Sequence, residues 1–467
     1  MSVDRKIDFA AACLRAEEAP GAGLIRALAV AEGFPWSARR LTRTTRQRSM
    51  PGLIATAAGS TVLCLAAWYH WANIDPGIRV PSLPVPAVNG YPLLVKAAAS
   101  VRGASEFSNA IDEINRSFRS PPLAGLSGRA PGSPSSLRAV EALISANQTS
   151  LGLVRRGEQL PSAALGIPLE RAGESPDSNF RDLGRLLALE QSVERMRHQY
   201  RAAADSGLDA VSLGCSVEHA EALTGMLVGI SIEAIGRNKE WTVINHLDAT
   251  DARKCLERLE RIEQSRAPYV DSLVQEKLSG ELALRHLFHI PWPGRLLEML
   301  LDVIRGLPYS KRQIYADYDR AMDACIQYSE SPYEANWSIT TGDPYADAFL
   351  PGVAQPYGTY DVNLSEERML LTEMALRCYY LDHSRYPSRV EELVGRYLQS
   401  RPYDPFRNGS QLTYRRTSSG YLLYSVGPDR VDHGGAWPHG RSASEERATY
   451  NMTAGRGYDL VAGHYPY

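Results

Sequence analysis

Two histidines at helical spacing are the first residues whose types could support chemistry. His286 and His289 stand three residues apart in the segment ALRHLFHI, so a helix would place both rings on one face. This spacing can supply two metal ligands, but no third partner is evident nearby in the sequence. We therefore interpret both as structural histidines and assign them no metal.

The sequence lacks the motifs of the common enzyme classes. It contains no G-x-S-x-G, Walker loop, dinucleotide-binding G-x-G-x-x-G or H-E-x-x-H motif. Adjacent carboxylates such as Glu366-Glu367 and Glu391-Glu392 point in different directions, and we interpret them as solvated surface. No catalytic residue is assigned. A hydrolase site in the helical region stays open as the alternative, because residues that meet only in space leave no local motif.

The region from Asp361 to Gly435 has the most organised pattern in the chain. Asn363 and Glu366 predict a capping box at the start of a long helix. That helix is expected to end near Arg385-Tyr386-Pro387. The remaining parts are a short helix (390–397), two strands (411–416 and 421–426) joined by a turn (417–420), and the loop Gly427 to Gly435.

This order of elements resembles the globular domain of the major pseudopilins of type II secretion. The matching motifs are Arg385-Tyr386-Pro387, Asp404-Pro405-Phe406 and Tyr424-Ser425-Val426-Gly427-Pro428-Asp429. The resemblance implies a small α+β domain over residues 361–436. It also implies calcium in the loop after the last strand, with Asp429 and Asp432 at the acidic positions. Two carboxylates, backbone carbonyls and water can supply the six to eight oxygens that Ca²⁺ takes.

Two features depart from the pseudopilin pattern. His433 stands where another acidic residue would be expected, which removes one hard ligand. A solvated Gly/Asp turn is therefore the open alternative to calcium. The apolar run near the N-terminus also lacks the processed leader of a pilin, and most of the chain separates it from the C-terminal domain. We therefore expect a borrowed module that does not polymerise as a pilin does.

Residues 50–72 are expected to form a single transmembrane helix. The stretch Gly52 to Ala72 is uncharged, mostly apolar and long enough to cross a bilayer. Five arginines precede it, which places residues 1–49 in the cytoplasm: Arg39, Arg40, Arg43, Arg46 and Arg48. The sequence thus predicts an inner (cytoplasmic) membrane protein, held in the lipid bilayer through residues 52–72, with most of the chain periplasmic or otherwise extracytoplasmic. A buried core helix is the alternative interpretation of this stretch.

Beyond this stretch, the proline-rich residues 73–92 predict an extended stalk. Residues 93–330 show a helical period and predict a domain of helical hairpins. Within it, Leu183 to Gly214 resembles one tetratricopeptide-type helix pair, although no 34-residue period runs through the chain. The expected helices are 93–117, 137–150, 181–204, 207–215, 217–237, 249–264, 268–289, 294–305 and 311–327. Residues 331–360 are expected to form a linker, and residues 437–467 an irregular tail.

Composition limits the partners. The 467 residues carry 51 basic and 53 acidic side chains, a net charge of −2, so no global field argues for nucleic acid. Four cysteines lie in the part of the chain expected outside the cytoplasm, namely Cys215, Cys255, Cys325 and Cys378. They could form two disulfides or be small buried apolar side chains.

Together these features predict a mainly α protein with one membrane helix, a helical-hairpin region and a small pseudopilin-like α+β domain. The whole plan resembles uncharacterised single-pass membrane proteins of planctomycetes and related bacteria, a resemblance that carries no established activity. We expect a membrane-anchored, non-enzymatic scaffold that binds protein partners, associated with a secretion or envelope assembly. An envelope hydrolase with its site in the helical domain is the alternative.

Overall fold

The chain divides into two compact units, and the structure describes most of one and little of the other. The computed structural model describes residues 86–107, 109–111, 134–162, 177–218, 222–287, 311–436 and 458–462, together with Cys64. The first unit comprises residues 1–78 and 290–317, and of it only Cys64 and residues 311–317 are described. The second unit comprises residues 79–289 and 318–467 and carries nearly all of the described structure.

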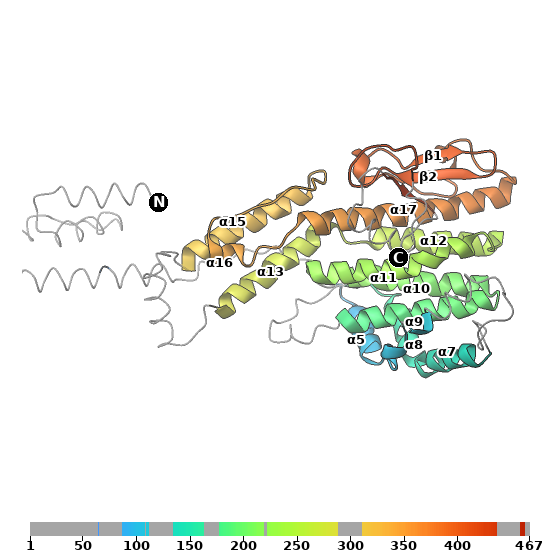
Figure 1. The fold of residues 1–467 in the computed structure, drawn as a ribbon, viewed down its shortest axis with the longest axis horizontal. Helices are drawn as coiled ribbons and strands as arrows, with labels where there is room; N and C mark the ends of the chain where they lie inside the picture. Colours follow the sequence, from blue (N-terminus) through green and yellow to red (C-terminus); the bar gives the residue numbers. More distant parts are fainter. Residues whose placement is uncertain are drawn as a thin grey trace, which may run out of the picture. The chain divides into compact units, whose positions relative to one another are not determined.

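Helices dominate the second unit, and a small antiparallel sheet completes it (Figure 1). The helices are α5 (Tyr91–Ala99), α7 (Pro134–Ala146), α8 (Gln148–Gly157), α9 (Asp177–Met196), α10 (Tyr200–Glu218), α11 (Leu223–Ile244), α12 (Ala249–Ser265), α13 (Tyr269–Leu287), α15 (Lys311–Ser329, which begins in the first unit), α16 (Pro344–Asp347) and α17 (Ala354–His383). Short 3₁₀ helices follow at Val390–Leu393 and Pro405–Arg407. The strands are β1 (Thr413–Arg416), β2 (Tyr421–Ser425) and β3 (Leu460–Val461). The mainly helical fold class is therefore confirmed.

The structure corrects the expectation of a single-pass membrane protein. Among the residues that it describes, no helix combines the length and the apolar run that crossing a bilayer requires. The predicted span itself, residues 50–72, lies outside the described residues except for Cys64, as do residues 1–49 and 73–85. The inner-membrane location and the contact with a lipid bilayer are accordingly withdrawn.

The break between α9 and α10 lies before the position expected from the sequence, which placed it between the helices 181–204 and 207–215. Residues 197–199 join the two helices, and His198 adopts the left-handed conformation with φ 59°. Gly207 lies inside α10, where a Cβ atom would collide with the side chains of Gln191 and Glu240. The glycine therefore permits close packing between helices and does not end one.

Backbone contacts between α10 and α11 set the spacing of the central helices. A Cβ atom on Gly214 would lie 2.6 Å from the carbonyl oxygen of Gly229, and the reverse distance is also 2.6 Å. One on Gly236 would lie 2.7 Å from the carbonyl oxygen of Gly207. The two pairs are seven residues apart on each helix, about two turns, so they lie on one face. The antiparallel helices can approach this closely only where side chains are absent.

The long helix α17 begins at Ala354 and not at the expected cap near Asn363. Asn363 is buried inside the helix, where its Nδ2 atom donates to Glu233 Oε2 (2.9 Å) and Glu218 Oε1 (3.2 Å). The predicted capping box is wrong. The side-chain amide of Asn363, which suggested a cap, instead binds carboxylates on α10 and α11. The start of α17 consequently lies within the range expected to be a linker.

A buried charge cluster joins α17 to the central helices. We define it as Glu218, Glu233, Arg237, Arg266, Asn363, Glu366 and Glu367. Arg237 donates to Glu233 Oε2 (3.1 Å) and Glu366 Oε2 (2.7 Å), and its side chain is 1% exposed. Arg266, the residue after α12, donates to Glu218 Oε2 (2.5 Å), Glu233 Oε2 (2.7 Å) and Glu367. The interpretation of Glu366-Glu367 as solvated surface is therefore wrong.

The buried charge cluster carries more carboxyl groups than guanidinium groups. Burial raises the pKa of Glu367 to about 8, so this carboxyl group is mostly protonated at neutral pH. Burial also raises the pKa of Glu218 well above its usual range. Retained protons reduce the net negative charge that two arginines cannot balance.

The C-terminal sheet packs beside the second half of α17 (Figure 1). β1 and β2 form the expected hairpin, with Thr413 opposite Tyr424. β3 pairs with β2 through Val461 and Tyr424, so the expectation of an irregular tail is wrong at this point. The apolar stripe of α17, including Met374 and Cys378, packs in one core with Leu259 of α12.

The cysteine alternatives are also resolved. Cys215, Cys255, Cys325 and Cys378 are free and buried. Burial raises the pKa of each thiol, to about 12 for Cys255 and about 11 for Cys325 and Cys378. They are small apolar side chains of the core, not disulfides or reactive thiols.

The glycine contact predicts a test with a matched control. We expect Gly214→Ala to lower the free energy of unfolding by about 1–3 kcal/mol, because the new methyl group overpacks the contact with Gly229. Gly152 lies inside α8, and no atom lies within 4 Å of the position that its Cβ atom would take. Gly152→Ala should therefore be stabilising by about 0.5–1 kcal/mol. Urea unfolding of both variants measures the difference. Equal effects would show that α10 and α11 are not in backbone contact.

The buried charge cluster yields a second prediction. Arg237→Met should destabilise the protein by about 3–5 kcal/mol, because Glu233 and Glu366 would stay buried without this cationic partner. The control is Arg253→Ala, which removes a half-exposed partner of Asp382 and should cost no more than about 1 kcal/mol. Thermal and urea unfolding provide the measurement. A loss for Arg237→Met no larger than the control would contradict the structural role of the cluster.

Candidate functional site

A polar cavity of about 1060 Å³ lies among α8, α9, α10 and α12. The turn after α8 supplies one side, including Ser162. α10 supplies a stripe of polar residues at intervals of three and four: Ser206, Asp209, Ser212 and Ser216. Helical periodicity places these on one face of α10, away from the glycines that pack against α11. The ionisable groups that line the cavity are Arg155, Glu158, Glu190, Glu194, Asp205, Asp209, Arg258 and Arg261, with Cys215.

Asp209 is the centre of a chain of five charged side chains. Arg155 donates through Nε to Asp209 Oδ2 (2.8 Å) and through Nη2 to Glu190 Oε2 (2.5 Å). Arg258 donates through Nη2 to Asp209 Oδ1 (2.6 Å) and to Glu158 Oε2 (2.7 Å). Each arginine is therefore held between two carboxylates. This arrangement ties α8, α9, α10 and α12 together around the cavity.

Glu194 has no such cation. Within the part of the chain that the structure describes, it forms no ion pair, and Ser206 Oγ donates to its Oε2 atom at 2.7 Å. The same hydroxyl lies 3.3 Å from Glu190 Oε2. Burial raises the pKa of Glu194 to about 7, and the negative charge of Glu190 acts in the same direction. Glu194 thus exchanges its proton close to neutral pH.

Two oxygen atoms beside the cavity are buried without a hydrogen-bond partner among the described residues, namely Glu158 Oε1 and Ser162 Oγ. The side chain of Glu158 is 5% exposed, and burial together with the charge of Asp209 raises its pKa well above the usual range. A buried acceptor left unsatisfied costs about 1–3 kcal/mol.

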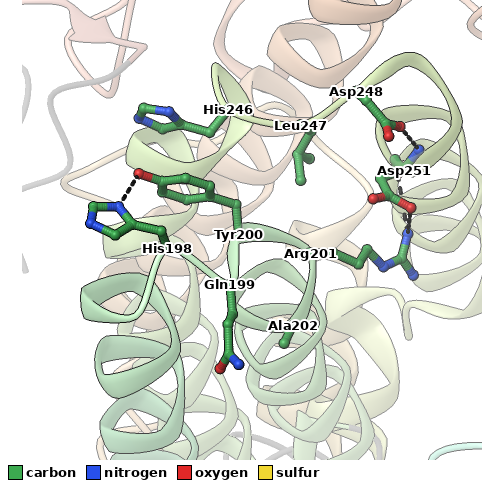
Figure 2. A pocket seen from close by; sticks show the side chains of 9 residues that line it. All are labelled: His198, Gln199, Tyr200, Arg201, Ala202, His246, Leu247, Asp248 and Asp251. Atoms are coloured by element: carbon green, nitrogen blue, oxygen red, sulfur yellow. Dashed lines mark hydrogen bonds and ion pairs between the residues drawn. The ribbon is translucent and has the colours of Figure 1, made fainter.

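A smaller cavity of about 560 Å³ lies where the ends of four helices meet (Figure 2). Its aromatic side is made by Tyr200, whose ring stacks on His246 at a centroid distance of 4.0 Å and whose hydroxyl lies 2.9 Å from His198 Nδ1. Asp248 accepts from two backbone N–H groups in the first turn of α12. Arg201 is paired with Asp205 at 2.7 Å. These polar groups are already engaged in capping and pairing, so the larger cavity is the better candidate site.

The predicted calcium residues lie in a loop that satisfies its own carboxylates. Asp429 Oδ2 lies 3.0 Å from His433 Nε2. Asp432 Oδ1 accepts from the Tyr424 hydroxyl (2.8 Å) and from the backbone N–H of Gly434 (2.9 Å). Among the described residues, no three His, Cys, Asp or Glu side chains are placed to hold a metal ion. Calcium in this loop, which the pseudopilin resemblance implied, is therefore tested by the melting experiment described at the end of this subsection.

The side chains of His286 and His289, which the sequence spaces for one helix face, are not described by the structure. The side chain of His286 and the whole of His289 lie outside the described residues. The same is true of the expected helix 294–305.

Sequence reasoning missed the cavity although part of its pattern is visible. The polar residues of α10 recur at helical spacing in a segment otherwise rich in Ala, Leu and Gly. The expected helix 207–215 left Ser206 and Ser216 outside it, so the stripe was not recognised. Arg155 and Glu158 carry no local signal, because their partners lie 35 to 100 positions away.

Comparisons with protein-family models, curated proteins and solved structures find no match for this chain. The function must therefore be argued from the residues of the site.

The loop at Asp429 generates a test. We expect the full-length protein to melt at the same temperature in millimolar calcium and in chelator, because both carboxylates are already hydrogen-bonded within the loop. Differential scanning fluorimetry provides the measurement. A higher melting temperature in calcium that Asp429→Ala or Asp432→Ala abolishes would show that the loop rearranges to bind the ion.

Proposed function

We propose that this protein is a binding protein whose helical region holds a small polar molecule in the cavity between α8, α9, α10 and α12. The observation that carries the proposal is a cavity of about 1060 Å³ whose lining brings charged and hydroxyl side chains together from four helices. That volume is comparable to the largest small-molecule pockets. The charged lining, in place of an apolar one, favours a ligand with several hydrogen-bonding groups.

The contents of the cavity support binding more than catalysis. Among its described lining residues there is no histidine to activate a serine, and burial raises the pKa of the Cys215 thiol well above its usual range. The arginines are held by carboxylates and not directed at an open position. We therefore propose binding of a small molecule here, in addition to the protein partners that the sequence suggested.

A hydrolase that uses the same cavity is the second candidate, and the pKa of Glu194 is the observation that favours it. A carboxyl group with a pKa of about 7 can serve as a general acid near neutral pH. Glu190, on the other side of the Ser206 hydroxyl, would supply a second carboxylate. Turnover of a bound compound, lost in Glu194→Gln while binding persists, would establish this candidate.

The binding proposal predicts that small polar compounds raise the melting temperature of the full-length protein. A ligand at about 100 times its dissociation constant adds about 2.7 kcal/mol, which is a shift of several degrees for a protein of this size. A panel of amines, polyols, sugars and carboxylic acids screened by scanning fluorimetry gives the measurement. Native mass spectrometry of the purified protein would detect a co-purifying compound.

A cavity-filling variant supplies the control. Ser216→Tyr, on the polar face of α10, should abolish the ligand-induced shift, while Ser419→Tyr, in the exposed hairpin turn, should leave it unchanged. Both proteins must first show the same helical circular dichroism. A shift that survives in Ser216→Tyr would place the ligand elsewhere and contradict the proposal.

A further inference from the structure

We infer that Asn408 is a site of self-modification, at which the backbone nitrogen of Gly409 displaces the side-chain amide as ammonia. This reaction uses neither the cavity nor the function proposed for it. The chain contains two Asn-Gly pairs, Asn89-Gly90 and Asn408-Gly409, and the structure places them in opposite surroundings. In the second pair, the guanidinium group of Arg430 also contacts the carbonyl oxygen of the amide.

The reaction needs only the two residues and water. The Gly409 nitrogen attacks Cγ of Asn408, the bond from Cγ to Nδ2 breaks, and ammonia leaves with the proton that the glycine nitrogen loses. The product is a five-membered cyclic imide. Water then opens this ring at Cγ, which leaves an ordinary aspartate, or at the backbone carbonyl carbon, which leaves an isoaspartate. A glycine in the second position favours the attack, because no Cβ atom shields its nitrogen.

The backbone nitrogen of Gly409 is free to act as this nucleophile. Both residues are exposed in the turn after the 3₁₀ helix Pro405–Arg407, and both have positive φ, 50° for Asn408 and 79° for Gly409. Among the described residues, the Gly409 N–H group donates no hydrogen bond. An atom added as Cβ on this glycine would meet nothing within 4 Å. The glycine nitrogen can therefore turn toward Cγ without a collision and without breaking a hydrogen bond of its own.

Arg430 activates the amide that is attacked. Its Nη2 atom donates to Asn408 Oδ1 at 2.7 Å. A hydrogen bond from a charged donor withdraws electrons from the carbonyl group and stabilises the negative oxygen that forms when the glycine nitrogen attacks. The same contact holds the side chain in one orientation, which favours a reaction between neighbouring groups. Arg430 lies in the loop Gly427 to Gly435, where its own backbone is left-handed with φ 60°.

The other Asn-Gly pair is protected by its surroundings. The Gly90 N–H group donates to the carbonyl oxygen of Pro161 at 2.9 Å, and Gly90 is buried at the start of α5. A Cβ atom on this glycine would lie 2.4 Å from the carbonyl oxygen of Gly157, so the backbone has no room to turn. Asn89 Oδ1 accepts from the backbone N–H of Tyr91 at 3.0 Å. Both reacting groups are therefore already engaged.

An isoaspartate at position 408 would disturb the C-terminal sheet, because it adds one atom to the main chain within a closed turn. The Ser410 N–H group donates to the Arg407 carbonyl oxygen (3.0 Å), and the Asp404 N–H group donates to the Ser410 carbonyl oxygen (2.7 Å). Asp404 is buried and accepts from Ser425 Oγ (2.8 Å) and from the Val426 N–H group (3.0 Å). The turn is thus connected to β2, and the modification changes the geometry of that connection.

Peptide mass spectrometry of the full-length protein, incubated at neutral pH, measures the reaction. The readouts are the mass gain when a carboxyl group replaces an amide, and the isoaspartate product, which chromatography separates from aspartate. We expect Asn408 to react about tenfold faster than Asn89 or more, since freeing the Gly90 nitrogen breaks a buried hydrogen bond. In urea the two sites should react at similar rates, because each asparagine is followed by glycine.

A substitution of Arg430 with a matched control tests the activating contact. Arg430→Met keeps a long side chain without the donor, and should slow the reaction at Asn408 about threefold or more in the folded protein. The same substitution should leave the rate in urea unchanged. Arg415→Met, at an exposed arginine of β1, should leave the rate unchanged in both conditions.

Equal rates at the two Asn-Gly pairs of the folded protein would overturn the assignment of Asn408 as the site. Persistence of the Asn408 amide in the folded protein, at times when it is lost in urea, would overturn it as well. A rate that Arg430→Met does not lower would remove Arg430 from the reaction. Equal slowing by Arg415→Met would attribute the effect to general positive charge and also overturn the role of this hydrogen bond.

Discussion

The close contact between α10 and α11 is the constraint on which the other features of the second unit depend. Two pairs of glycines, two turns apart, bring the helix backbones together where any side chain would collide. Because one face of α10 is used for this contact, its polar residues must turn toward α8, α9 and α12. The same approach brings Glu218 of α10 close to Glu233 of α11, so that one arginine can contact both. The cavity and the buried charge cluster thus lie next to a single helix pair.

The buried charge cluster connects the C-terminal module to the central helices. Burying ionised groups costs several kcal/mol each, and good geometry with retained protons is needed to offset that cost. Arg266 and Arg237 each contact more than one carboxylate, and Glu367 keeps a proton near neutral pH. Since Asn363 and Glu366 lie on α17, the long helix cannot slide along α11 without leaving these groups unpaired. The cluster therefore selects one register for the helix that carries the sheet.

The cavity resembles the buried charge cluster in its ionisable groups but differs from it in the solvent exposure of its arginines. Both places contain more carboxyl groups than guanidinium groups, and burial raises carboxyl pKa values in both. In the buried charge cluster the arginines are almost fully buried, whereas the side chain of Arg155 at the cavity is 41% exposed. Groups that solvent can reach can also be reached by a ligand. This difference is consistent with a structural role for the cluster and supports the binding role that we propose for the cavity.

The sequence by itself determined the local elements. The 3.6-residue period predicted most helices, including α12, and the turn at residues 417–420 placed β1 and β2. These features depend on hydrogen bonds and packing within a few residues, so they are visible in a short segment. Tertiary structure alone decided that Asn363 is not a cap and that Glu366 is buried, because its partner Arg237 lies 129 positions away. Tertiary structure alone also formed the cavity, because its acidic and basic groups come from four helices. It likewise formed β3, which exists only because residues 460–461 pair with β2. Charged residues that a sequence suggests are exposed can be buried by helices that are distant along the chain, and a local sequence pattern contains no information about that packing.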